Sequence, residues 1–223
     1  MKCQFFLVLL VLPFLSCKNY LSEPTESFDL YFEKPQPVND SELSKIPSRF
    51  FGSYCINENF FLEVTKDQIV TKHFDTYRFH KNLLDSLKVE FHVTKDKFIS
   101  KNDAEFQFDY KFVGDSIELS DINVNTLFGF SDRQKMKRVG NCLILNEKDS
   151  VFWKAKIVRF DKKSVAIEYI GDLSDLDQFD SITKVKSKKI DSTKFILSPS
   201  RREFKKYMEL SKKSPFHKFN KDI

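Results

Sequence analysis

Apolar and polar residues alternate along most of the chain between Phe50 and Leu197. Successive side chains of a strand point to opposite faces of a sheet, so a period of two predicts β-strands with one buried face. The clearest run is 106–112, where every second residue is aromatic and a Gly-Asp pair follows at 114–115 before an apolar return strand. This pattern predicts a β-hairpin.

Two further segments repeat one hairpin pattern. Residues 62–70 (LEVTKDQIV) and 91–99 (FHVTKDKFI) start 29 positions apart, and each places Thr-Lys-Asp between two β-rich runs. Similar hairpins are expected over 143–153 and 157–170, around polar turns at 146–149 and 161–163. Such closely spaced short strands predict a mainly β fold, an antiparallel meander either closed as a barrel or folded as a sandwich.

Two short helices are predicted near the end of the chain. Apolar residues recur every three positions from 173 to 182, after Asp172 or Ser174 as the N-cap. A helix is also expected over about 200–213, because Ser200 and Glu203 form a capping-box pattern. The apolar residues of this helix, expected to pack on the sheet, are Phe204, Tyr207 and Met208.

The N-terminal segment predicts export. A basic residue, an apolar run and a small residue precede Cys17, and the run is shorter than the about 20 residues that span a bilayer. The segment resembles a bacterial lipoprotein signal peptide, with Phe14-Leu15-Ser16-Cys17 as the lipobox. The resemblance implies that residues 1–16 are removed and that Cys17 carries a diacylglycerol and an acyl chain such as palmitate. The alternatives are a plain signal peptide and a buried N-terminal helix.

This resemblance also implies a location in the cell envelope, with the membrane as a partner through the lipid anchor. Lys18 follows the cysteine, where enteric bacteria place an Asp to retain a lipoprotein in the inner membrane. We therefore expect the outer membrane as the destination. The composition, rich in Phe, Lys and Asn and poor in Ala and Gly, is similar to that of proteins from low-GC, Bacteroidetes-type bacteria.

Composition shifts suggest the domain boundaries. Residues 17–47 contain four prolines among serines and acids and are expected to form a lipidated tether. Within it, Phe28, Leu30 and Phe32 alternate with polar or aromatic residues, which predicts a short strand docked on the body or on a partner. A single β-rich domain is expected over 48–213, followed by a basic, frayed tail over 214–223.

Positive charge is concentrated at the C-terminal end. The whole chain carries +5, but from residue 181 onward there are thirteen Lys and Arg against four Asp and Glu. An exported protein rarely meets nucleic acid, so the partner expected for this surface is anionic lipid, an anionic polysaccharide or an acidic protein face. The alternative is the solvated side of an amphipathic helix. The candidate residues are Arg201, Arg202, Lys205, Lys206, Lys212 and Lys213.

Besides the lipidated Cys17, the exported part holds two cysteines, Cys55 and Cys142. An oxidising envelope compartment permits a disulfide between them, and the long loop between them would give such a bridge a stabilising effect of about 4 kcal/mol. The alternative is a pair of separate thiols that pack as small hydrophobic groups.

Motifs for catalysis, metals and cofactors are missing from the sequence. The four histidines, at positions 73, 80, 92 and 217, form no metal-ligand spacing, and the acidic stretch 172–180 lacks the Gly and Glu of a calcium loop. There is no nucleophile elbow and no Gly-rich phosphate loop among only five glycines. We therefore expect neither an enzyme nor a cofactor.

The segment Phe51-Gly52-Ser53-Tyr54 ahead of many strands is similar to the first strand of calycins, or lipocalins, although Tyr54 stands where that family has Trp. This resemblance implies a barrel with a ligand cavity. Four functions stay open: an envelope lipoprotein that binds a protein or polysaccharide, a calycin-like carrier of a small apolar ligand of unknown identity, an immunity-type inhibitor of a toxin, and an envelope hydrolase.

Overall fold

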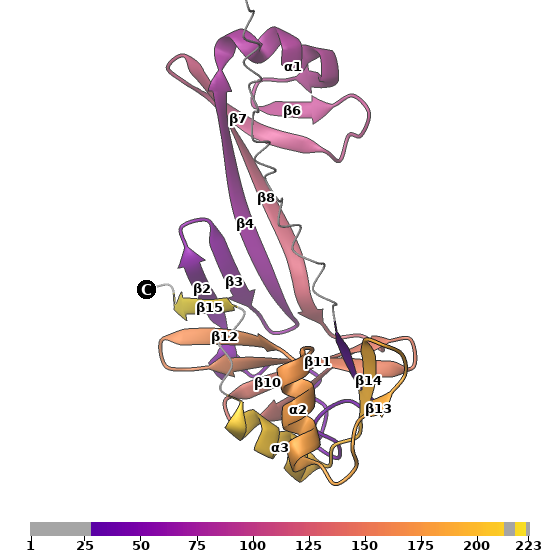
Figure 1. The fold of residues 1–223 in the computed structure, drawn as a ribbon. Coiled ribbons are helices and arrows are strands. Elements are labelled where there is room, and N and C mark those ends of the chain that lie inside the picture. Colours follow the sequence, from indigo (N-terminus) through magenta and orange to yellow (C-terminus); the bar gives the residue numbers. More distant parts are fainter. Residues whose placement is uncertain (1–27, 212–216, 222–223) are drawn as a thin grey trace, which may run out of the picture.

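The computed structural model describes residues 28–211 and 217–221 (Figure 1). A body of curved sheet and two helices occupies one end, and two long paired strands form an arm that carries a small lobe at the other end. The signal segment, Cys17, Lys212 and Lys213 lie outside the described residues.

The described part of the chain is mainly β, as the alternation predicts. Its helices are α1 (Leu84–Glu90), α2 (Leu173–Ile182) and α3 (Arg201–Leu210), with short 3-10 turns at Ser48–Phe50 and Lys81–Leu83. Its strands are β1 (Asp29–Phe32), β2 (Gly52–Asn57), β3 (Phe60–Val64), β4 (Gln68–His80), β5 (Phe91–Val93), β6 (Lys97–Ser100), β7 (Gln107–Val113), β8 (Ser116–Gly129), β9 (Gln134–Val139), β10 (Cys142–Asp149), β11 (Phe152–Phe160), β12 (Ser164–Tyr169), β13 (Lys188–Lys189), β14 (Lys194–Leu197) and β15 (His217–Lys221).

All fifteen strands belong to one sheet that is not closed into a barrel. The predicted hairpins are present as β3–β4, β5–β6, β7–β8, β10–β11 and β11–β12. The closed-barrel form of the prediction is wrong, because the strand path ends at free edges, one at β13 and the other at β5 in the lobe. Nor is the sheet wholly antiparallel, since β1 pairs in parallel with β14.

Two apolar cores lie on the two faces of the β10–β11 hairpin. Leu143, Leu145 and Val158 face a core shared with β2 and β3, whereas Ile144 and Ile157 face a core covered by α2 and α3. Both the odd-numbered and the even-numbered positions of this hairpin therefore include apolar residues, as in a strand that is buried on both faces.

The two helices of the body begin as the sequence predicts. The Asp172 side chain accepts a hydrogen bond from the Asp175 amide, and Ser200 and Glu203 form the reciprocal capping box of α3. Each cap satisfies amides that would otherwise lack a partner at the helix start. The apolar face of α3 packs on the sheet: Phe204, Tyr207 and Met208 are all buried.

Both ends of the predicted domain need correction. The short docked strand predicted within the tether is confirmed as β1, where the buried Phe32 ring lies edge-on to that of Phe179, at 5.7 Å between centroids. The expectation that the tether continues to residue 47 is wrong, since Ile46 is also buried. Within the expected basic tail, β15 lies between β12 and β2, and Phe219 is fully buried. Burial of these apolar side chains outweighs the polar, proline-rich or basic composition around them.

The arm consists of β4 and β8, which pair from Gln68 with Gly129 to His80 with Ser116. The lobe at its end holds α1 and strands β5–β7 (Figure 1). Its small core is aromatic: Phe98 is buried, with its ring 4.5 Å from Tyr110 and 6.1 Å from Phe91. At the β7–β8 turn Gly114 has φ of +62°, a conformation that favours glycine.

Candidate binding surfaces

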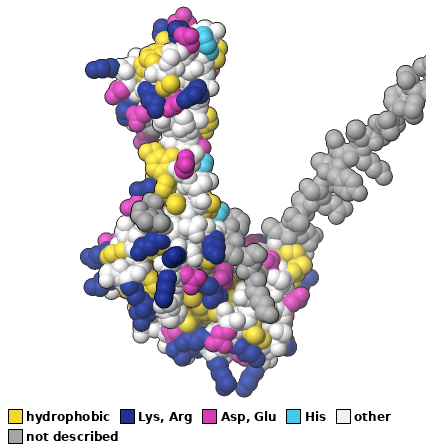
Figure 2. Space-filling view, turned by 90° about the vertical axis from the view of Figure 1, so that its left-hand side faces the viewer, with side chains coloured by type: hydrophobic (Ala, Val, Ile, Leu, Met, Phe, Trp, Pro, Cys, Tyr) yellow, Lys and Arg dark blue, Asp and Glu magenta, His cyan; other side chains and the backbone are white. Residues whose placement is uncertain are grey.

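The arm and its lobe hold a larger share of the exposed large apolar residues than of the described chain. Residues 68–129 make up a third of the described chain, yet they hold eight of its sixteen exposed large apolar residues. Figure 2 shows such side chains halfway along the arm and on the lobe. The eight residues are Tyr77, Leu83, Val89, Phe106, Phe112, Val113, Ile122 and Val124. We call this set the arm surface.

The middle of the arm presents one apolar face. Phe74 lies opposite Ile122 and Lys72 opposite Val124, so these side chains share one side of the two strands. Phe61 of β3 extends the face, with its ring 5.5 Å from that of Phe74. A hollow of about 430 Å³ lies beside these two rings. Ile122 and Val124 are more than half exposed, so apolar area is left uncovered here.

The lobe exposes aromatic rings at its rim. Phe106 is 53 % and Phe112 is 56 % exposed, although each contacts a neighbouring ring. The Phe106 centroid is 4.7 Å from that of Phe108, and the Phe112 centroid is 5.6 Å from that of Tyr110. These contacts hold the exposed rings in place while leaving one side of each to solvent.

Charge on the arm is mixed and nearly balanced. Residues 68–129 hold eight Lys and Arg and ten Asp and Glu, a net charge of −2. Near the lobe, Glu118 accepts hydrogen bonds from Lys111 at 2.7 Å and Arg78 at 2.5 Å, and these bonds lower the pKa of its carboxyl. The arm is therefore suited to a partner recognised by apolar contact and shape more than by net charge.

The predicted basic residues of α3 are divided between two roles. Arg201 forms an ion pair with Asp40, and Lys205 lies 3.8 Å from the same carboxylate. Arg202 and Lys206 instead line a groove of about 800 Å³. Sequence reasoning missed the other basic residues of this groove, Lys34 and Lys184, since they come from distant segments that carry no motif.

Cys55 and Cys142 are free thiols, so the predicted disulfide is wrong. Strands β11, β12 and β15 lie between β10 and β2, which places the cysteines four strand spacings apart, about 19 Å along the sheet. A disulfide requires Cα atoms within roughly 7 Å. Cys142 instead lies 3.7 Å from an Arg159 guanidinium nitrogen, and burial raises the pKa of its thiol.

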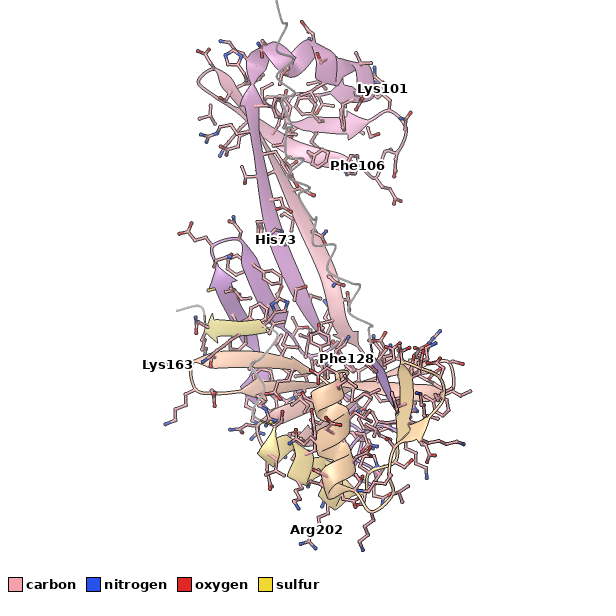
Figure 3. The ribbon with its side chains drawn as sticks, viewed as in Figure 1. His73, Lys101, Phe106, Phe128, Lys163 and Arg202 are labelled. Atoms are coloured by element: carbon pink, nitrogen blue, oxygen red, sulfur yellow. The ribbon has the colours of Figure 1, made fainter. Side chains whose placement is uncertain are left out.

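The histidines are dispersed. His73 contacts the Asp75 carboxylate at 3.0 Å on the arm (Figure 3), His92 is exposed in the lobe, and His217 lies in β15. Burial lowers the pKa of His217. Within residues 28–211 and 217–221, no three His, Cys, Asp or Glu side chains converge as a metal site would require.

The interior that a carrier would use is filled. Residues from β2, β3, β10, β11, β12 and β15 form one continuous apolar core there. Tyr54, at the position that prompted the calycin comparison, is buried in this core, with its ring 6.1 Å from that of Phe160. The ring of Tyr54 is therefore part of the packed core of the body.

Among the described residues, no helix combines the length and the apolar character needed to cross a bilayer. Comparisons of the chain with protein-family models, with curated proteins and with solved structures found no match.

Proposed function

We propose that the protein is a lipid-anchored component of the cell envelope that acts by binding another protein, and that the arm surface makes the contact. The lipobox-like Phe14-Leu15-Ser16-Cys17 supports the anchor. One observation supports the binding role: two long strands hold a lobe away from the body, and large apolar side chains are exposed on these strands and on the lobe.

The arm and its lobe gain little stability from their own contacts. A two-stranded ribbon has little stability of its own, and the lobe buries only a few side chains below 2 % exposure, such as Phe98 and Ile117. Exposed apolar groups that share one face, as Phe74, Ile122 and Val124 do, typically mark an interaction site. Burying one Phe or Val of the arm surface in a partner would contribute about 1.5–3 kcal/mol.

A calycin-like carrier is less well supported, because the sheet is not closed into a barrel and the core around Tyr54 and Phe160 is packed with apolar side chains. A polysaccharide could stack on the exposed aromatic rings of the arm surface, but five of its eight side chains are aliphatic and offer neither charge, hydrogen bonds nor a ring, so this partner is also less well supported. A protein partner with an apolar patch fits all of these side chains.

Photo-crosslinking in the native host tests the proposal. A photoreactive amino acid at Val89 or Phe112 should yield one discrete protein adduct. The same group at Val151, which is exposed on the body, should not yield this adduct. An excess of soluble Cys17→Ser protein should suppress the adduct, whereas the same competitor with Phe106→Ser and Phe112→Ser should not. Adducts only with lipid, with polysaccharide or with a second copy of the chain would refute the proposal.

The anchor is tested separately. Cys17→Ser should move the protein from the membrane to the soluble fraction, because the acyl chains are lost. Retention of this variant on membranes after a salt wash would contradict the lipoprotein assignment.

A further inference from the structure

The groove beside α3 lies at the end of the molecule opposite the lobe. Figure 3 places Arg202 at one extreme and Lys101 and Phe106 at the other. Three separate segments form the groove: residues 33–39, residues 182–185 at the end of α2, and residues 198–206 at the start of α3. Its volume of about 800 Å³ falls in the usual range of ligand sites, about 300–1,000 Å³.

The rim of this groove carries a net positive charge. Lys34, Lys184, Arg202 and Lys206 line it, and no carboxylate of the described residues lies within 4.0 Å of their charged nitrogens. Their neighbours Arg201 and Lys205 are directed to Asp40 instead. Figure 2 shows Lys and Arg side chains gathered at this end of the body.

The acids of the groove neutralise its positive charge only in part. Glu203 accepts hydrogen bonds from the amides of Ser200 and Lys184, both at 2.8 Å, so it completes the cap of α3. Hydrogen bonds from Ser200 lower the pKa of this carboxyl. Glu33 is the other acidic residue, which leaves a net charge of +2 from four basic and two acidic lining residues.

The base of the groove holds a buried acceptor without a donor. Gln36 is 1 % exposed, and its Nε2 donates to the Lys34 carbonyl at 3.0 Å. Its Oε1 has no hydrogen-bond partner among the described residues, a state that is unfavourable for a buried acceptor. The Gln36 backbone is fixed by Asn146, whose side chain binds both its amide and its carbonyl. A ligand that opens the groove at Gln36 and donates a hydrogen bond to Oε1 would satisfy this acceptor.

We propose that this groove binds an acidic peptide segment of another protein. Carboxylates of such a segment would meet the basic rim, and its backbone N–H groups could donate to Gln36 Oε1. Its aliphatic side chains would pack on walls that include Val38, Ile182 and Val185. Among the described residues, none that lines the groove is aromatic, so these residues offer no ring on which a sugar could stack, and this favours a peptide over an anionic polysaccharide.

Fluorescence anisotropy with the full-length protein in mild detergent tests this proposal. The probe is a labelled octapeptide of alternating Glu and Val, and the control peptide replaces Glu with Gln. The acidic peptide should bind at least tenfold more tightly, and its binding should weaken with added salt. Arg202→Glu with Lys206→Glu should weaken binding at least tenfold. Lys162→Glu with Lys163→Glu, the same charge change at the exposed β11–β12 turn, should have no more than a twofold effect.

Gln36→Leu separates a binding role from a structural one. It removes the unpartnered acceptor together with the hydrogen bond from Nε2 to the Lys34 carbonyl, so the thermal midpoint should change little, while the affinity for the acidic peptide should drop several-fold. The proposal is overturned if the charge reversal at 202 and 206 leaves peptide binding unchanged. It is also overturned if hexagalacturonate binds this groove more tightly than the peptide, because the site would then be one for polysaccharide.

Discussion

Replacement of Phe219 by Ala tests whether the C-terminal strand belongs to the folded body. Phe219 is fully buried, pairs in register with Val165 and has its ring 5.5 Å from that of Phe60. Truncating a buried Phe to Ala typically costs about 3–5 kcal/mol, since both the transfer energy and the packing are lost. The total stability of a domain is about 5–15 kcal/mol, so the loss would be a large fraction of it.

Urea unfolding monitored by circular dichroism measures this loss. A cost of about 4 kcal/mol corresponds to a fall of roughly 1.3–2 M in the urea midpoint for an m-value of about 2–3 kcal/mol/M. Lys218→Ala on the same strand is the control, because Lys218 is exposed and its loss should cost within about 0.5 kcal/mol. Phe219→Leu should fall in between and gives a value if the Ala variant does not fold. Equal midpoints for Phe219→Ala and Lys218→Ala would show that β15 does not contribute to the core.

Three further predictions concern local features. Asp172→Ala and Ser200→Ala should each lower the free energy of unfolding by about 1 kcal/mol, because each removes an N-cap, and urea titrations that show no loss would contradict the capping geometry. Non-reducing peptide mapping of the unfolded, alkylated protein should find both Cys55 and Cys142 alkylated, and a linked peptide pair would contradict the strand order. Burial lowers the pKa of His217 below about 6.5, so the unfolded state binds the proton more readily, and stability should fall as the pH drops from about 6.5 toward that lowered value. Denaturant titrations at pH 7.5 and 5.5 measure this fall as the difference between two free energies of unfolding. His217→Gln should make this difference smaller, and an unchanged difference would exclude His217 as its source.

Features that depend on neighbouring residues could be predicted from the sequence. The Thr-Lys-Asp turns at 65–67 and 94–96 lie between paired strands, and the caps at Asp172 and Ser200 begin helices. In each case the residues that decide the structure lie within a few positions of one another. The mainly β class follows from the same local signals, repeated along the chain.

Features that depend on distant segments could not be predicted. β15 occupies the gap between β12 and β2, and β1 pairs with β14 across more than 160 residues. Nothing in the sequence of 217–221 names its neighbours, and its basic composition is typical of an exposed tail. The groove has the same origin, because Lys34, Lys184 and Arg202 come together only through this long-range order.

The arm shows most clearly why alternation alone does not reveal a binding surface. Phe74 in β4 and Ile122 in β8 follow the same period of two as Leu143 and Val158, which are buried in the body. A period of two tells which side chains share a face, but it does not tell what covers that face. In the body, a second layer of strands or helices covers it; on the arm, no described segment covers Ile122 or Val124. The apolar residues that matter most for the proposed function are therefore those that resemble core residues in the sequence and differ from them only in the fold.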